Sequence, residues 1–122
     1  MTELQEKQLA FLEETAGFYS TNNRALNNTG DCVYISTDKS PGCAIGRHIP
    51  AELAKNLDDA PFSGVSNDDI FNTLPYSLKE LTKMFLMNIQ DLHDTAWNWD
   101  EEGLTEAGRK KVLAIRTDFN LF

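Results

Sequence analysis

The segment that most constrains the fold is a long stretch of apolar residues at helical spacing between residues 78 and 96. A stripe of apolar side chains runs along it: Leu78, Leu81, Phe85, Ile89, Leu92 and Ala96. Ser77 and Glu80 have the spacing of a capping box at its start. Met84, Leu86 and Met87 make the middle of the stretch apolar nearly all round, which is typical of a helix enclosed by others. We therefore expect the longest helix, from about Leu78 to Ala96, to lie at the centre of the molecule.

Four further helices are predicted around this one from caps and periodicity. The first covers residues 3–19, where Thr2 and Gln5 form another capping box. Pro50 suits the first turn of a short helix at 51–57. Another short helix starts near Ser66 and ends before Pro75, and the last runs from a Thr105 cap to about Asp118.

A β-hairpin is expected between the first helix and Pro50. Cys32-Val-Tyr-Ile-Ser36 alternates with a period of two, residues 37–42 have a turn composition, and Cys43-Ala-Ile45 returns as a second strand. An isolated hairpin is marginal in water, so it must pack on helices. The sequence thus predicts a single α+β domain over residues 1–122, with four to five helices around one short antiparallel hairpin.

Length and composition exclude several classes of protein. The chain has 122 residues, of which 41% are apolar, enough for one compact core and too few for two. No apolar run approaches the length of a membrane span, and the acidic start Met1-Thr-Glu-Leu-Gln-Glu6 is unlike a signal peptide. We therefore expect a cytoplasmic protein without a membrane partner, whose Cys32 and Cys43 are reduced thiols.

The net charge of −8, from 11 basic and 19 acidic residues, disfavours broad contact with a nucleic-acid backbone. A basic protein partner, or solubility alone, fits it better. Only the last helix is locally basic, through Arg109, Lys110, Lys111 and Arg116.

No metal or cofactor site is predicted. Cys32, Cys43, His48 and His93 are suitable zinc ligands, but the gaps between them are ten, four and forty-four residues. Structural zinc sites usually take their ligands in close pairs. Two small buried thiols and two partly exposed imidazoles are the simpler interpretation.

A catalytic thiol is an alternative, with Cys43 as nucleophile and with His93 and Asp94 as its partners. Neighbours on a helix point in different directions, so we expect no orienting bond within the 91–94 segment. Any triad must then be assembled by the fold. The simpler interpretation is that Cys43 packs in a strand and that His93 and Asp94 lie along a helix edge.

The segment Gly42-Cys-Ala-Ile-Gly46-Arg47-His48 is a candidate anion site. Small residues let backbone N–H groups approach a phosphate, and Arg47 adds a bidentate fork beside His48. The segment lacks the lysine of a phosphate loop and a helix directly after it. A turn and a bulge explain the glycines equally well.

Two indoles and three acids follow the long helix: Trp97, Trp99, Asp100, Glu101 and Glu102. Exposed tryptophans are favoured anchors at interfaces. We expect one indole to cap the core and the other to contact a partner protein. Alternatively, the chain's many carboxylates serve as an acidic mimic of nucleic acid or as a solvated surface.

Three motifs recur together in one known group of proteins. They are Cys32-Val-Tyr, Gly42-Cys-Ala-Ile-Gly-Arg-His-Ile-Pro50 and Leu92-His-Asp94. In these the chain resembles, over about residues 8–110, a group of small uncharacterised proteins encoded by bacteria and by tailed bacteriophages. The resemblance implies a single domain and a phage or mobile-element origin, and it carries no catalytic residue across.

The leading functional prediction is a small acidic accessory protein that binds a host or cellular protein stoichiometrically and inhibits or redirects it. The incomplete catalytic sets and the −8 charge motivate this prediction. The alternative is a nucleotide- or phosphoester-binding protein or enzyme with a site at Cys43, Arg47, His48 and His93. A structural subunit that forms a homo-oligomer is a third possibility.

Overall fold

A computed structural model describes residues 1–21, 44–58 and 68–122 of the chain. Over these residues it forms six α-helices, two short 3₁₀ helices and a two-stranded antiparallel sheet. In chain order they are α1 (Glu3–Phe18), η1 (Gly46–His48), α2 (Ala51–Asp58), α3 (Asp68–Thr73), α4 (Tyr76–Lys79), α5 (Lys83–Asp94), η2 (Ala96–Asn98), β1 (Trp99–Asp100), β2 (Gly103–Leu104) and α6 (Glu106–Asp118). The prediction of a small α+β domain is confirmed.

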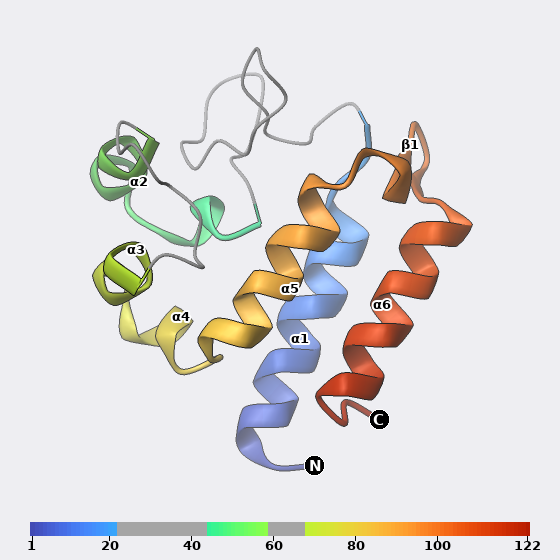
Figure 1. The fold of residues 1–122 in the computed structure, drawn as a ribbon, viewed down its shortest axis with the longest axis horizontal. Coiled ribbons are helices and arrows are strands. Elements are labelled where there is room, and N and C mark those ends of the chain that lie inside the picture. Colours follow the sequence, from blue (N-terminus) through green and yellow to red (C-terminus); the bar gives the residue numbers. More distant parts are fainter. Residues whose placement is uncertain (22–43, 59–67) are drawn as a thin grey trace.

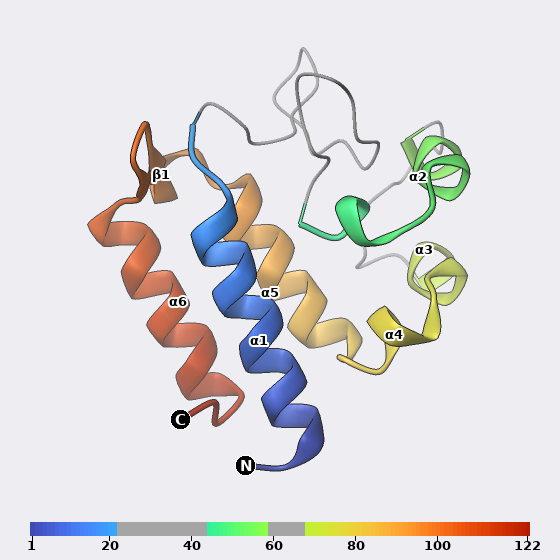
Figure 2. The same cartoon turned by 180° about the vertical axis from the view of Figure 1, so that it is seen from behind.

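Three of the helices form a bundle, in which α1, α5 and α6 lie side by side in both ribbon views (Figures 1 and 2). The two termini lie at one end of this bundle and the β1–β2 hairpin lies at the other. Leu12, Phe85, Ile89, Leu92 and Ile115 are fully buried where the three helices meet. Burial of each such side chain contributes about 1.5–3 kcal/mol. Helices α2, α3 and α4 flank the bundle on the side away from α6 (Figure 1).

Both long end helices begin at the predicted caps. At α1, Thr2 Oγ1 accepts from the Gln5 amide at 3.1 Å, and Gln5 Oε1 accepts from the Thr2 amide at 2.8 Å, which completes the capping box. At α6, Thr105 Oγ1 accepts from the Gly108 amide at 3.2 Å. The predicted helix ends, at residue 19 and at Asp118, lie within one residue of those observed.

The prediction of one continuous helix from 78 to 96 is wrong. The chain forms α4, breaks, and starts again as α5 with Thr82 as its cap. Thr82 has φ 78° and ψ 147°, a conformation that few residues with a side chain adopt. Pro75 precedes α4, and the Ser77–Glu80 capping box does not form.

The break lets both segments reach the core, because Leu78 and Leu81 are buried before it and Phe85 is buried after it. Gln8, a buried polar residue of α1, donates to the Leu81 carbonyl at 2.8 Å. In a continuous helix the Leu81 carbonyl would accept a hydrogen bond from the Phe85 amide. Here the Phe85 amide donates to Thr82 Oγ1 instead, and Gln8 supplies the donor for the Leu81 carbonyl. Helix α5 is central as predicted, although Met84 is 61% exposed on its outer side.

The short helices lie close to their predicted positions. Helix α2 follows Pro50 and reaches Asp58, one residue beyond the expected end, and α3 ends before Pro75. Ser66, the predicted cap of α3, lies outside the described residues.

Most of the hairpin predicted at 32–45 cannot be compared with the structure, because residues 32–43, with both cysteines, lie outside the described residues. Ala44 and Ile45 form a turn with buried side chains, so the strand prediction is wrong for these two. The sheet observed in the described residues pairs Trp99 with Leu104 and Asp100 with Gly103, between η2 and α6.

Candidate interaction site at the hairpin end

His93 and Asp94 form a contact that the sequence analysis excluded. His93 Nδ1 and Asp94 Oδ1 are 2.6 Å apart, so adjacent residues do make an orienting bond here. This is possible because Asp94 is the last residue of α5, where the chain leaves the helix. The Asp94 carboxylate accepts a hydrogen bond from the His93 Nδ1–H, which fixes the orientation of the ring.

The surroundings of His93 are those of a structural side chain. Its side chain is 0% exposed, and the Tyr19 ring packs edge-on against it with centroids 4.7 Å apart. The Trp99 indole donates to the His93 carbonyl at 3.1 Å and to the Leu92 carbonyl at 2.9 Å. Cys43, the proposed nucleophile, lies outside the described residues. Of the two described members of the triad, His93 is therefore buried away from bulk solvent, whereas the Asp94 side chain is 38% exposed.

The other histidine has different partners. His48 Nε2 lies 3.2 Å from Glu14 Oε1, and the His48 ring packs on Phe11 with centroids 4.8 Å apart. Phe11 lies in α1 and Tyr19 directly follows the end of that helix, eight positions later, or roughly 12 Å along the helix axis. The two imidazoles therefore lie at different heights of the bundle. A phosphate at His48 would meet the Glu14 carboxylate, which disfavours an anion site there. The side chain of Arg47 lies outside the described residues.

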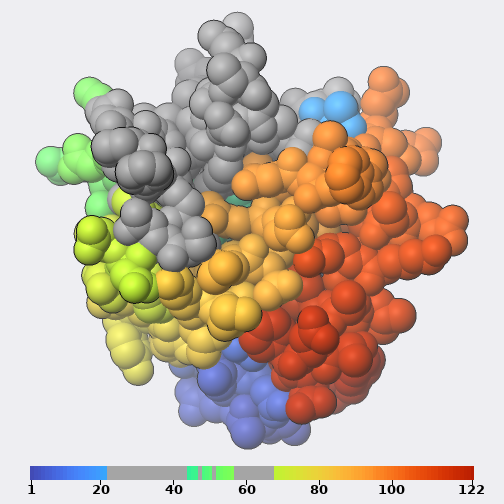
Figure 3. All heavy atoms as spheres, in the orientation of Figure 1, coloured from blue at the N-terminus to red at the C-terminus, as the bar shows by residue number. Residues whose placement is uncertain are grey.

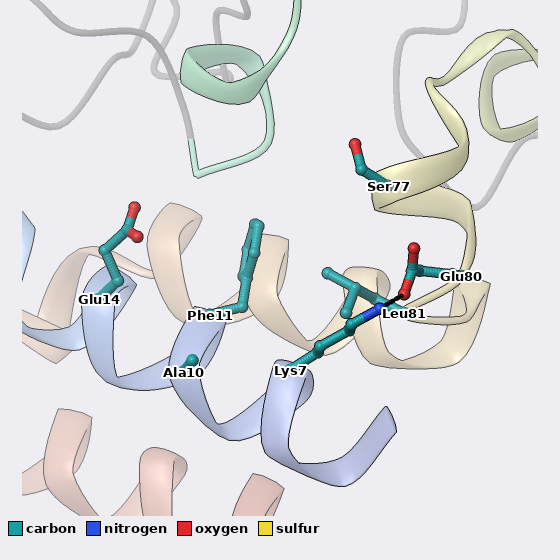
Figure 4. Close-up of a pocket in the computed structure, with 7 residues that line it drawn as sticks. All are labelled: Lys7, Ala10, Phe11, Glu14, Ser77, Glu80 and Leu81. Atoms are coloured by element: carbon teal, nitrogen blue, oxygen red, sulfur yellow. Dashed lines mark hydrogen bonds and ion pairs between the residues drawn. The ribbon is translucent and has the colours of Figure 1, made fainter. Parts of the chain in front are cut away.

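A hollow of about 350 Å³ opens between α1 and α4. It is lined by Lys7, Ala10, Phe11, Glu14, Ser77, Glu80 and Leu81 (Figure 4). Phe11 and Leu81 point into the space, and a 2.6 Å ion pair joins Lys7 to Glu80 on one side of it (Figure 4). The hydrogen bond to Glu80 raises the pKa of Lys7 above its ordinary 10.5. Lys7 is thus a fully charged ammonium at neutral pH and is neither a base nor a nucleophile.

Sequence reasoning missed this hollow, and none of the predicted site residues that the structure describes lines it. Lys7 and Glu80 are 73 residues apart, so no local motif joins them. The described lining of the hollow carries two carboxylates and one ammonium, which give no excess of positive charge to attract an anion. These residues therefore do not favour the phosphate site that the alternative function requires.

The two tryptophans have opposite environments. Trp97 is 74% exposed, whereas Trp99 is 4% exposed and uses its indole N–H within the fold. One indole thus caps the core and the other faces outward, as the sequence analysis expected of the pair. Trp99 is therefore removed from the predicted partner-binding residues, because its ring cannot reach a partner.

The acidic residues predicted to bind a partner lie at the tip of the β1–β2 hairpin. Asp100, Glu101 and Glu102 are all exposed. Asp100 Oδ1 accepts from the Glu102 amide at 2.8 Å, which holds the turn. Trp97 precedes them by three residues. We call these four side chains, Trp97, Asp100, Glu101 and Glu102, the hairpin-end surface.

Hydrogen bonds fix the backbone at the exposed indole and at the residue after it. Thr105 Oγ1 donates to the Trp97 carbonyl at 2.6 Å, and the Thr105 amide donates to the Asn98 carbonyl at 2.9 Å. The buried Asn98 side chain donates to the Leu92 carbonyl at 3.2 Å. Trp97 is thus an exposed ring on a well-anchored 3₁₀ turn.

In residues 1–21, 44–58 and 68–122, no cluster of three or more histidine, cysteine or acidic side chains is arranged to hold a metal ion. None of the helices in the same ranges combines the length and the apolar character that crossing a bilayer requires.

Comparisons with protein-family models, with curated protein sequences and with solved structures found no match to this chain. The resemblance to the bacterial and bacteriophage group stays a prediction. The function must therefore be argued from the side chains themselves.

Proposed function

We propose that this protein is a small acidic accessory protein that binds another protein stoichiometrically through the hairpin-end surface. The observation that carries the proposal is the 74% exposure of Trp97. An exposed indole leaves a large apolar area in water, and tryptophan is among the residues that contribute most to binding when an interface covers them.

The anchored backbone strengthens this argument. Hydrogen bonds from Thr105 to the Trp97 and Asn98 carbonyls hold the end of η2 in place. Binding then orders little more than the side chain itself, which lowers the entropic cost of association. A ring on a preorganised turn is suited to insertion into a pocket of a partner.

The charges beside the ring indicate the chemistry of the partner. Asp100, Glu101 and Glu102 follow Trp97 within five residues and are exposed, on a chain of net charge −8. A lysine or arginine can lie over an indole face while its charge meets a carboxylate. The proposed partner is therefore a host or cellular protein with a basic, exposed segment, whose own contacts the bound chain would block.

The test is affinity capture from the lysate of the source cells, with the captured proteins quantified by mass spectrometry. Trp97→Ala should lose a specific partner that the wild-type chain retains. The matched control is Tyr76→Ala, since Tyr76 is 76% exposed and lies on α4, away from the hairpin (Figure 1). Tyr76→Ala should leave capture unchanged.

The charge contribution is tested by the triple variant Asp100→Asn, Glu101→Gln, Glu102→Gln. Its control removes three exposed acids elsewhere: Glu6→Gln, Glu13→Gln, Glu52→Gln. Capture of the same partner should fall only in the first triple variant. If both triple variants lost the partner equally, the effect would come from the net charge of the protein and not from the three acids of the hairpin end. Retention of the partner by Trp97→Ala, or catalytic turnover of a substrate by the purified protein, would overturn the proposal.

A further inference from the structure

A second surface, on the outer side of α6, is left unused by the hairpin-end proposal. Arg109, Val112, Leu113 and Arg116 follow the spacing i, i+3, i+4, i+7, so they share one face of the helix. With Leu104 they line a hollow of about 190 Å³. Leu113 is 55% exposed. We call these five residues the α6 groove.

The groove lies along a flank of α6, beside the face that packs on the bundle, and Val112 and Leu104 are partly buried against the core. Gly108 and Ile115 are the buried residues of α6, and they point to its inner side. In the ribbon views α1 and α5 lie on one side of α6 (Figures 1 and 2). The atoms of α6 form an outer edge of the molecule in the space-filling view (Figure 3).

The two arginines are fixed in place by backbone carbonyls. Arg109 Nη1 donates to the Leu104 carbonyl at 3.1 Å, and Arg116 Nε donates to the Leu121 carbonyl at 3.0 Å. The Arg116 guanidinium also lies 5.1 Å from the centre of the Phe122 ring. Each guanidinium has five N–H donors, so most of its hydrogen-bonding capacity is still available.

Neither arginine forms an ion pair with a carboxylate in the described part of the chain. The adjacent lysines differ, because Lys110 pairs with Glu106 at 3.7 Å and Lys111 pairs with Asp91 at 2.8 Å. In a chain with an excess of eight acids, two positioned guanidinium groups without carboxylate partners among the described residues favour a ligand that brings its own carboxylates.

We propose that the α6 groove binds an acidic amphipathic helix of a partner protein. An apolar side chain of that helix, such as leucine, enters the hollow against Val112 and Leu113. Two carboxylates about two helical turns apart reach Arg109 and Arg116, whose separation along α6 is roughly 10 Å. Bidentate arginine–carboxylate pairs then fix the register of the docked helix.

The overall charge favours a helix over a larger anionic partner. A membrane surface or a nucleic acid would also meet the carboxylates of the hairpin end and of the chain's other acidic residues, and the −8 net charge would oppose its approach. A single helix contacts only the groove and avoids them.

The experiment uses a fluorescein-labelled helical peptide with leucines on one face and glutamates two turns apart beside them. The comparison peptide carries lysine at each glutamate position. Fluorescence anisotropy with the full-length protein should show saturable binding of the glutamate peptide alone. Binding of both peptides, or of neither, would overturn the proposal.

Variants assign the binding to the groove. Arg109→Gln with Arg116→Gln should raise the Kd on the order of tenfold or more, since two charge-assisted bonds are lost. Leu113→Ser should raise it on the order of tenfold through lost apolar contact. The control pair Lys79→Gln with Lys110→Gln removes the same charge outside the groove and should change the Kd less than about twofold.

Circular dichroism establishes that the variants are folded, and Arg109→Lys with Arg116→Lys separates charge from geometry. The lysine pair keeps both charges and should recover only part of the affinity, because lysine cannot form the planar fork. Equal weakening by the control pair would overturn the proposal. Binding to anionic lipid vesicles in place of the peptide would also overturn it. The same holds if the protein forms a homodimer that Leu113→Ser converts to a monomer.

Discussion

Gly108 allows α6 to pack closely against η2. A Cβ atom built there would lie 2.3 Å from the Asn98 carbonyl oxygen and 2.7 Å from Leu104 Cδ2. The first neighbour is backbone, held by the Thr105 amide, and it cannot move aside cheaply. Glycine inside a helix normally costs about 1 kcal/mol relative to alanine, so its presence in α6 is explained by this close approach to η2.

We predict that Gly108→Ala destabilises the protein by about 2 kcal/mol or more, as overpacking outweighs the gain in helix propensity. The measurement is the free energy of unfolding in urea. Gly17→Ala is the matched control, because Gly17 also lies in a helix and has nothing within 4 Å of an added Cβ. It should stabilise the protein by about 0.5–1 kcal/mol. A Gly108→Ala protein as stable as Gly17→Ala would contradict the close packing of α6 on η2.

The candidate site could be predicted from the sequence only in part, and the two tryptophans show why. Trp97 and Trp99 are separated by one residue, and as tryptophans both are of a residue type that often anchors interfaces. Their exposures of 74% and 4% follow from the turn of η2 and from the carbonyls of Leu92 and His93 at the end of α5. Local sequence does not contain those tertiary contacts. The two predicted histidines likewise have partners on α1 that no motif indicated.

At the scale of elements, helices with capped ends were predictable and the break in the central apolar stretch was not. Thr2 and Thr105 cap their helices through side-chain bonds to nearby amides, which are local and visible in sequence. Thr82 interrupts the stripe with a positive φ that usually requires glycine. The β1–β2 hairpin was not predicted either, because its local signal is weak. Strands of two residues are too short for an alternating pattern to appear.

The end of α6 offers an element-scale prediction. Asn120 has φ 55°, and the Leu121 amide donates to the Arg116 carbonyl at 2.8 Å while the Asn120 amide donates to the Thr117 carbonyl at 3.3 Å. These are the two bonds of a Schellman motif, whose left-handed position favours glycine. The motif directs Leu121 into the core, where it is 0% exposed.

We predict that Asn120→Gly raises the free energy of unfolding by about 0.5 kcal/mol, because glycine adopts this conformation without steric cost. Asn120→Ala should lower it by about 1 kcal/mol. Thermal or urea denaturation of the three proteins checks the order glycine, asparagine, alanine. If alanine were the most stable of the three, α6 would not end in the left-handed turn described here.

At the scale of the whole molecule, α5 contributes more buried residues than the described side chains of α2 and α3. Six residues of α5 are buried, and α5 packs against both α1 and α6. In α3 the buried residue is Ile70, and Ala54 is buried in α2. The functional proposals concern the bundle side, since the hairpin end and the α6 groove both extend from α6 and the turn before it.

This distribution predicts that the two parts open with different free energies. Helices of eight and six residues have little stability of their own, so α2 and α3 depend on tertiary contacts, which among the described side chains include those of the buried Ala54 and Ile70. In native-state hydrogen exchange, we expect the central amides of α1, α5 and α6 to exchange only through global unfolding. The amides of α2 and α3 should exchange at least about tenfold faster, through local opening. With added urea, exchange in the bundle should accelerate steeply, whereas exchange in the flank should change little, because local opening exposes little surface. Equal protection of α2 and α5 would instead require the flank and the bundle to unfold as one cooperative unit, anchored by contacts beyond Ala54 and Ile70.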